Sequence, residues 1–268
     1  MHNMNPAALA PEIDRLVWAV NFRARDHEVD LAILEKAGMD PSAFGTLNNL
    51  VPFVDVLTEE FVLRRYLYRP PQVLKAFIAN MVDGGFFSRD GNHLRPTDRV
   101  QPILEELNTA VRNSARYFWV DHRDTVEAAA GPVRRILEAS PERFDLAQAA
   151  ISGPKPDDLF HRFHYRLSGL RLLRNEAHVE AWRRYDLTPR EIEVLTAAWG
   201  GNETQTPVVM TDRLEERGLA ADGVVTAAGL KLRQTIEDET NVGVVSAFAT
   251  VDQDSLYSVL VSLPPETP

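Results

Sequence analysis

Residues 157–185 read DDLFHRFHYRLSGLRLLRNEAHVEAWRRY, and this stretch decides the expected fold. It contains no proline and a single glycine, Gly169, so we expect one long helix over the whole stretch, with Pro156 just before its first turn. Successive residues of a helix are about 100° apart, which gives this helix one apolar face. Its members are Leu159, Phe163, Leu170, Leu173, Ala177 and Ala181.

A second face of the same helix carries polar and aromatic side chains at intervals of three or four residues, which keeps them on one side. We call this face the polar stripe; it consists of His161, His164, Ser168, Arg171, Asn175, His178 and Trp182. Apolar residues flank it on both sides, so we expect it to be partly buried. Buried polar groups need partners from the protein, from water or from a ligand. The polar stripe is therefore either a ligand site or a hydrogen-bonded contact with another helix, and the sequence leaves both open.

If the polar stripe is a site, His178 and Arg171 are its candidate catalytic residues, because an imidazole can move a proton and a guanidinium can hold an anion. The candidate ligand-binding residues are His161, His164, Ser168, Asn175 and Trp182, together with Trp18 and Arg25 from an N-terminal helix. Asp26, Asp30 or Asp121 could add a carboxylate, and the sequence does not decide among them.

The motifs of metal and cofactor chemistry are missing from the sequence. There is no cysteine and no HExxH pattern, and His178 would lie about 21 Å along the helix from His164 at 1.5 Å per residue, too far to share an ion with the His161–His164 pair. No GxSxG, P-loop or GxGxxG sequence is present. We therefore expect no metal and no cofactor.

Composition is that of an ordinary globular protein, with 268 residues, 44% hydrophobic and 25% charged. The lack of cysteine, of an 18-residue apolar run and of a signal-peptide pattern predicts a cytoplasmic protein without a membrane partner. The formal net charge of −10 argues against a nucleic-acid partner, although a local basic face could still exist.

Two segments of the chain share one pattern. Residues 81–109 and 213–241 each contain a helix that ends at glycine, a short strand that meets Asp-Gly, and a second strand that runs into a helix led by threonine. We interpret them as two winged-helix units at about 40–110 and 187–243 in a mainly α protein whose strands are confined to small two-stranded wings. The expected domains are an N-terminal helix (1–39), the first winged-helix unit (40–111), a helical middle with the long helix (112–186), and the second winged-helix unit with a C-terminal helix (187–268).

Capping residues and chain breakers set the expected element boundaries. Thr58 should cap a helix that ends before Pro70 and Pro71, and a hairpin should turn at residues 89–92. Residues 1–10 should be frayed. The other expected helices span residues 11–37, 72–85, 96–107, 113–139, 141–150 and 253–263.

From Leu170 onward, the segments LRLLRNEAHVEAWRRYDLTPREIEVLTAAWGG and LEERGLAADGVVTAAGLKLRQTIEDETN resemble an actinobacterial helix-turn-helix family of the SalK type, often associated with natural-product gene clusters. The residues that carry the resemblance are Arg171, Arg174, Ala177, His178, Leu187, Thr188, Glu191, Val194, Leu195, Arg217, Gly218, Leu219, Asp222, Gly223, Thr226, Gly229, Leu232 and the run from Glu237 to Thr240. The resemblance and the polar stripe together suggest a small-molecule-binding protein of secondary metabolism, with a cofactor-independent enzyme as the favoured form. The alternative is a winged-helix transcriptional regulator of MarR type, which a ligand could control.

Charge separates these alternatives. The recognition helix expected at residues 207–217 has three acidic residues against two arginines, and the wing that follows has no basic residue. The first unit is better supplied, with Arg64, Arg65, Arg69, Lys75, Arg89 and Arg95. DNA binding usually needs about 6–10 phosphate contacts, so the sequence favours a small-molecule partner over DNA. By analogy with other winged-helix proteins, we expect a homodimer.

Overall fold

The computed structural model describes residues 6–29, 32–39, 46–47, 50, 57–153, 156–200 and 212–265. The chain forms two compact units, the first from residues 1–173 together with 247–268, and the second from residues 174–246. The boundary between them falls inside two helices, α9 (Leu159–Arg183) and α12 (Ala227–Phe248).

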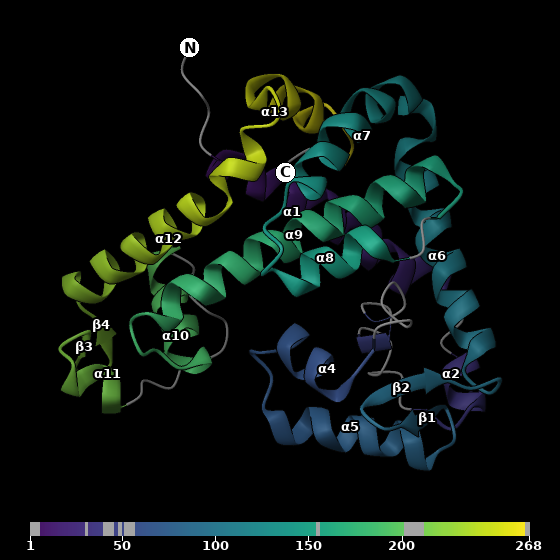
Figure 1. The fold of residues 1–268 in the computed structure, drawn as a ribbon, viewed down its shortest axis with the longest axis horizontal. Helices are drawn as coiled ribbons and strands as arrows, with labels where there is room; N and C mark the ends of the chain where they lie inside the picture. The colour runs from purple at the N-terminus through teal and green to yellow at the C-terminus, as the bar shows by residue number, and fades with distance from the viewer. Residues whose placement is uncertain are drawn as a thin grey trace. The chain divides into compact units, whose positions relative to one another are not determined.

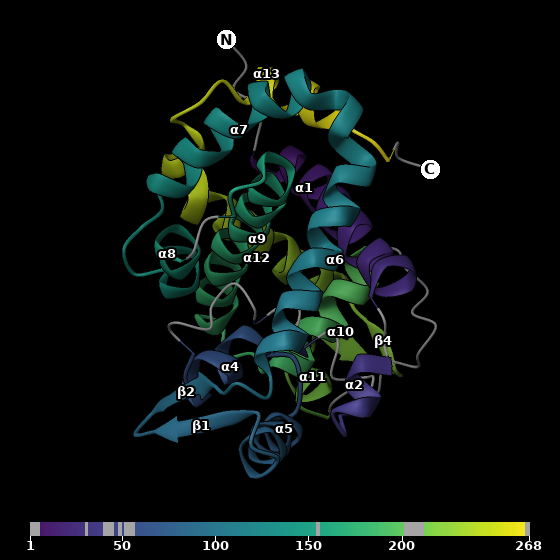
Figure 2. The same cartoon turned by 90° about the vertical axis from the view of Figure 1, so that its right-hand side faces the viewer.

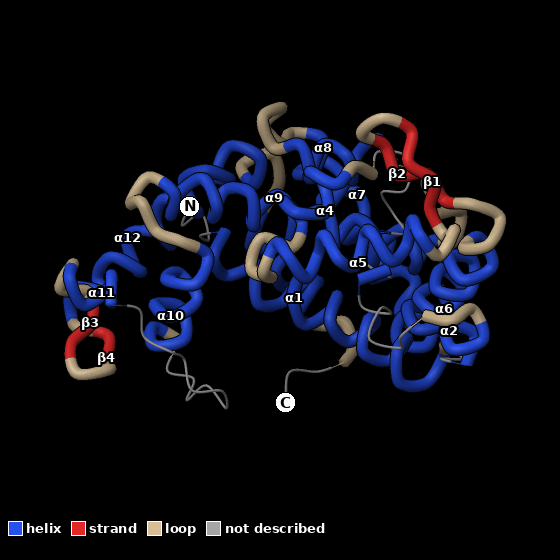
Figure 3. Tube along the Cα trace, turned by 90° about the horizontal axis from the view of Figure 1, so that it is seen from below, coloured by secondary structure: helices blue, strands red, loops and turns tan. Residues whose placement is uncertain are grey.

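Helices make up most of both units, and the strands of the described residues form two short hairpins (Figure 3). The first unit contains α1 (Pro6–Arg23), the π-helical turn η1 (Ala24–Glu28), α2 (Ala32–Lys36), α4 (Glu59–Arg65), α5 (Pro71–Asp83), β1 (Phe87–Asp90), β2 (His93–Pro96), α6 (Gln101–Trp119), the 3-10 turn η3 (Val120–His122), α7 (Arg123–Glu138), α8 (Asp145–Ser152) and α13 (Gln253–Val261), as Figure 1 shows. The second unit contains α10 (Pro189–Trp199), α11 (Asp212–Glu216), β3 (Ala220–Ala221) and β4 (Val224–Val225). The predicted fold class, mainly α with small two-stranded wings, is confirmed.

The N-terminal helix differs from its prediction at both ends. Helix α1 already begins at Pro6, a residue that the first turn of a helix tolerates, and Leu9 is fully buried, so the predicted fraying up to residue 10 is wrong. At the other end, η1 interrupts the predicted single helix. Arg23 binds the Glu28 carboxylate at 2.8 Å, and this five-residue spacing fits a π-helical turn better than an α-helical one. Leucines continue to recur at helical spacing after this point, so the sequence pattern predicts an uninterrupted helix.

The first helix–helix–hairpin module contains the capped helix and the hairpin that the sequence predicts at residues 58–96. The Thr58 hydroxyl accepts a hydrogen bond from the Phe61 N–H at 3.0 Å and caps α4. The hairpin pairs Asp90 with His93 around Gly91, whose φ of 59° is one that glycine adopts without strain. The module has its own core, to which α5 contributes Leu74, Ile78 and Met81, β2 contributes Leu94, and α6 contributes Ile103, Leu104 and Leu107. Much of the segment 40–57, which the sequence suggests to be a short helix and turns, lies outside the described residues.

The helical middle is divided differently from its prediction. One helix, α6, covers residues 101–119, in place of two that were expected to end at 107 and to start at 113. Asn108 and Thr109 are weak helix formers rather than helix breakers, so α6 continues through them. Its last residue, Trp119, is fully buried and packs edge-on against Phe163 of α9, with ring centroids 5.4 Å apart. The predicted helix at 141–150 is α8, which begins later, at Asp145.

The C-terminal helix α13 packs against α1 and α7 (Figure 2). Arg15 of α1 donates to the carbonyl oxygens of Leu260 and Leu263 at 2.9 and 2.8 Å, which satisfies carbonyl groups that a helix end leaves without partners. The Trp119 indole donates to the Pro264 carbonyl at 2.8 Å. Side chains from distant parts of the chain therefore fix α13 in the first unit.

The second unit repeats the order helix, helix, hairpin, helix. Thr188 and Glu191 form a reciprocal capping box at the start of α10. The hairpin pairs Ala220 with Val225, and Thr226 caps the following helix by accepting from the Gly229 N–H at 3.2 Å. Residues 201–211, which include the start of the predicted recognition helix, lie outside the described residues. None of the described helices is both long and apolar enough to cross a membrane.

Gly229 allows the first turn of α12 to approach the wing. A Cβ atom at this position would lie 2.4 Å from the Leu219 carbonyl oxygen and 2.7 Å from Cγ1 of Val225. We expect Gly229→Ala to destabilise the second unit by about 1–3 kcal/mol through overpacking. Gly131, within α7, is the matched control, because its added Cβ would meet nothing closer than Arg135 at 3.9 Å. Gly131→Ala should stabilise by about 0.4–1 kcal/mol. Urea unfolding measures the free energy of unfolding of both variants. Equal changes in the two variants would contradict the prediction.

Candidate functional site

Helix α9 positions the polar stripe, and Asp158 fixes where the helix starts. One carboxylate oxygen of Asp158 accepts from the backbone N–H groups of Phe160 and His161, each at 3.0 Å, so Asp158 is the N-cap. Arg116 of α6 binds the other oxygen at 2.8 Å. The apolar face is buried except at its first member, Leu159, which is partly buried: Phe163, Leu170, Leu173, Ala177 and Ala181 are at most 3% exposed. The polar stripe itself is divided, with His161 to Arg171 in the first unit and Asn175 to Trp182 in the second.

In the first unit, the polar stripe contains the buried His164 and the partly buried His161, both uncharged at neutral pH. His164 is 7% exposed and forms a hydrogen bond with the Val17 backbone, whereas its Nε2 atom has no partner among the described residues. Burial lowers the pKa of His164 to about 3 and that of His161 to about 4. Ser168 is partly buried on the same face. This half of the polar stripe therefore contains an unsatisfied polar atom.

Arg171 joins this half of the polar stripe to α1. Its guanidinium forms an ion pair with Asp14 and lies over the Trp18 ring, 4.6 Å from the ring centre. Trp18 thus contacts the polar stripe at Arg171. The carboxylate is Asp14, which the sequence analysis did not consider.

The other candidates from this part of the chain lie elsewhere. Arg25 binds Asp26 at 2.6 Å and lies over the Phe22 ring, 5.2 Å from its centre, and neither contact involves the polar stripe. Asp30 lies outside the described residues. Asp121 lies exposed in the turn η3.

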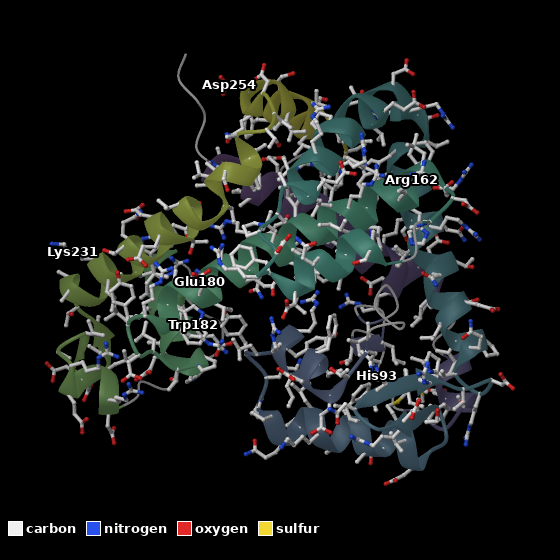
Figure 4. All side chains as sticks on the ribbon, in the orientation of Figure 1. His93, Arg162, Glu180, Trp182, Lys231 and Asp254 are labelled. Carbon is white, nitrogen blue, oxygen red and sulfur yellow. The ribbon has the colours of Figure 1, made fainter. Side chains whose placement is uncertain are left out.

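In the second unit, His178 forms a hydrogen bond with a neighbouring helix. Its Nδ1 atom lies 3.1 Å from the hydroxyl of Thr240 on α12, and this hydroxyl also donates to the Ile236 carbonyl at 2.7 Å. Burial lowers the pKa of His178 to about 3, which makes it a weak base for chemistry at neutral pH. Trp182, near the C-terminal end of α9 in Figure 4, is 2% exposed, and its Nε1 has no partner among the described residues. Asn175 is partly buried.

A buried ion network lies beside His178, and the sequence analysis did not identify it. Glu237 of α12 binds Arg174 of α9 and also Arg233, the latter at 3.0 Å. Arg233, which is 5% exposed, donates in addition to the Thr196 hydroxyl of α10 at 2.9 Å. Removal of one member of such a buried network leaves an uncompensated charge, so the packing of these helices depends on the network staying complete. In the second unit, the contacts of His178 and of this network therefore favour the hydrogen-bonded contact between helices over a catalytic site.

The exposed face of α5 has a composition suited to reading DNA bases. Leu74, Ile78 and Met81 face the core. The exposed residues are Pro71, Gln72, Val73, Lys75, Ala76, Ala79, Asn80 and Asp83. Amide, ammonium and methyl groups of this kind make the common contacts with base edges in the major groove.

The wing that follows α5 carries exposed basic side chains. Arg89, His93 and Arg95 are exposed, and Figure 4 shows His93 at this hairpin. Arg89 pairs with Glu59, and Arg95 pairs with Asp90, each at 3.2 Å. The Arg95 and Asp90 side chains are 65% and 68% exposed. Exposed pairs contribute only about 0–1 kcal/mol, so phosphate groups could replace the carboxylates at little cost.

The corresponding surface of the second unit is acidic. On α11, Asp212, Glu215 and Glu216 are exposed. Arg213 binds the Asp186 carboxylate, and Arg217 donates to the Tyr185 carbonyl at 2.8 Å. Both arginines are therefore engaged within the unit, and the wing contributes only the charge of Asp222. The acidic side chains of this surface would repel a phosphate backbone.

Metal binding has no site in the described part of the chain, where no three histidine or carboxylate side chains gather closely enough to hold an ion. In comparison with known proteins, residues 93–265 match a family described as the Helix-turn-helix family. The match starts at β2 and therefore includes α10 and α11 but not α5. No curated protein and no solved structure matches the chain.

Proposed function

Because the chain belongs to the Helix-turn-helix family over residues 93–265, we propose that it is a winged-helix transcriptional regulator that binds DNA through α5 and the β1–β2 wing. The observation that carries this proposal is the exposed face of α5 with Gln72, Lys75 and Asn80, followed in the chain by a wing with exposed basic residues. A winged-helix transcriptional regulator is the alternative function that the sequence suggests, beside the favoured enzyme.

The chemistry of α5 suits a helix in the major groove. Glutamine and asparagine side chains pair with adenine, lysine pairs with guanine or with a phosphate, and alanine contacts the methyl group of thymine. Lys75 is the exposed cation of this face, and Ala76 and Ala79 keep the helix surface narrow enough for a groove. Arg89 and Arg95 of the wing would contact the phosphate backbone beside the helix.

The second helix–helix–hairpin module then has a different role. Its acidic α11 is unsuited to phosphate, and its arginines hold the turn at Tyr185 and Asp186. We propose that this module contributes packing or a protein contact rather than DNA contacts. A negatively charged chain with one basic reading surface would bind DNA in a defined orientation.

Lys75→Ala should weaken DNA binding and reduce its salt dependence. A duplex chosen by selection from random sequence is titrated at several salt concentrations, and binding is measured by fluorescence anisotropy. Loss of one phosphate contact should lower the slope of log K against log salt by about 0.9. Arg95→Ala should do the same. Gln72→Ala and Asn80→Ala should instead relax sequence preference, by about 1–3 kcal/mol for each lost base contact.

Lys231→Ala is the matched control, because Lys231 is an exposed lysine of α12 in the second unit (Figure 4). It should leave affinity and salt slope unchanged. The proposal fails if no selected duplex binds at micromolar concentration, or if Lys231→Ala weakens binding as much as Lys75→Ala does.

The finer expectations from the sequence stay predictions. They are the SalK-type assignment, a role in natural-product metabolism, a catalytic function of His178 and Arg171, and a homodimer. The low pKa and the Thr240 contact of His178 argue against acid–base catalysis by this residue. Ligand binding, by contrast, is supported by a separate set of contacts in the first unit.

A further inference from the structure

Arg65 of α4 is a partly buried cation that pairs with no carboxylate among the described residues. Its Nε atom is inaccessible to solvent and has no hydrogen-bond partner among the described residues. The guanidinium lies 5.7 Å from the ring centre of the neighbouring Tyr66, and burial lowers the pKa of Arg65. A buried charge ordinarily requires an opposite charge or a full set of hydrogen bonds. Arg65 has neither within the described part of the chain.

A second guanidinium group adds to the positive charge around Arg65. Phe61 of α4 packs against the apolar cluster that contains Leu172 of α9, which brings this helix to the part of α9 that carries Arg171. The positive charge of Arg171 further lowers the pKa of Arg65. The carboxylate of Asp14 pairs with Arg171, so two neighbouring cations share one anion. The Asp14 side chain is 52% exposed, so solvent reaches this side of the cluster.

The third member of this group is His164, which has a buried ring nitrogen without a hydrogen-bond partner among the described residues. His164 lies two helical turns before Arg171 on the same face of α9, and the charge of Arg171 acts on it. With one ring nitrogen used by the Val17 backbone, Nε2 is a buried polar atom without a partner in the described part of the chain. Trp18 forms an aromatic wall, 40% exposed and stacked on Phe22 at 5.3 Å between ring centres.

We propose that Arg65, Arg171, His164 and Trp18 form a binding site for a small molecule that carries an oxyanion, either a carboxylate or a phosphate. Two guanidinium groups offer paired N–H donors that match the oxygens of such a group. A bound oxyanion would supply the charge that Arg65 lacks, and the exposed ring of Trp18 would contact the rest of the molecule. The site is independent of DNA binding and lies entirely in the first unit.

Thermal unfolding with two probe anions tests the site. Inorganic phosphate and benzoate are each compared with sodium chloride at equal ionic strength. We expect at least one of them to raise the melting temperature of the wild type above the chloride control, since a ligand that binds only the folded state stabilises it. The effective anion identifies the group recognised, phosphate or carboxylate.

Arg65→Gln should abolish this response, and Arg64→Gln is the matched control. Arg64 is the preceding residue of α4, and it pairs with Asp145 on the surface. Without added anion, Arg65→Gln should melt no lower than the wild type, because it removes an uncompensated cation. The proposal is overturned if neither anion stabilises the wild type beyond chloride, or if Arg65→Gln keeps the response.

Asp14→Asn gives a second test that does not depend on how Arg65→Gln folds. Asp14 competes with a ligand for Arg171, so its neutralisation should lower the dissociation constant of the effective anion severalfold, as measured by calorimetry. A purely structural role of the ion pair predicts unchanged or weaker anion binding. Either of those outcomes overturns the proposal.

Discussion

Acidification from pH 7 towards pH 4 should unfold this protein, the first unit more steeply than the second. Burial lowers the pKa values of His161, His164 and His178 to about 4, 3 and 3 from an ordinary value of 6.5. At pH values between these lowered pKa values and 6.5, the histidines of the unfolded chain bind more protons than those of the folded chain. The stability that neutral histidines provide is therefore complete above pH 6.5 and is lost as the pH falls towards 3.

The expected loss is large. Inside this pH window, each histidine lowers the free energy of unfolding by about 1.4 kcal/mol per pH unit. The first unit contains His161 and His164, and the second contains His178. A domain is usually stable by only about 5–15 kcal/mol, so a fall of two pH units can remove much of that margin.

The variant His164→Gln isolates one of these groups. Urea unfolding followed by circular dichroism at several pH values should give a shallower dependence on pH for His164→Gln than for the wild type, whatever its absolute stability. His93→Gln is the control, because His93 is exposed on the wing. Equal pH slopes for His164→Gln and the wild type would show that His164 does not take up its proton on unfolding.

Short-range chemistry explains what the sequence predicted of the fold. Thr58 precedes two glutamates and caps α4, Pro71 opens α5, and Gly91 turns the first hairpin. Each of these signals acts within a few residues and needs no tertiary contact to be read. The interruption after Arg23 lacks such a signal, because it depends on an ion pair between Arg23 and Glu28 that only the folded turn brings together.

The candidate site was predictable on one helix only. Periodicity placed His164, Arg171 and His178 on one face of α9, and the structure agrees. Their partners lie far away in sequence: Asp14 for Arg171 and Thr240 for His178. No spacing rule identifies such partners, because helix packing brings them together.

The surroundings of Arg65 were also not predictable from the sequence. The sequence analysis counted Arg65 among the cations of the first unit that could serve DNA binding, whereas the structure shields its Nε from solvent. A sequence pattern gives the face of a helix, but it does not show which neighbouring element covers that face. The covering element decides whether a charge is solvated or needs a ligand.

Glu237→Gln should destabilise the second unit by about 3–5 kcal/mol, because it removes one partner of a buried ion network. Glu237 is the carboxylate of both Arg174 and Arg233, and Arg233 is 5% exposed. Glutamine keeps the shape of the side chain but leaves both guanidinium groups without a negative charge. Glu239→Gln is the matched control on the same helix, because Glu239 pairs with the exposed Arg184 at 3.3 Å. Its cost should stay below about 1 kcal/mol.

Unfolding free energies of both variants, with amide hydrogen exchange in α10 and α12, measure the difference. A triple replacement, Arg174→Met with Arg233→Met and Glu237→Leu, separates charge pairing from packing. Apolar side chains of similar volume often replace a buried ion network without loss of stability, so the triple variant should recover most of what Glu237→Gln loses. If Glu237→Gln costs no more than Glu239→Gln, the network does not hold α9, α10 and α12 together, and its charges are available for a ligand instead.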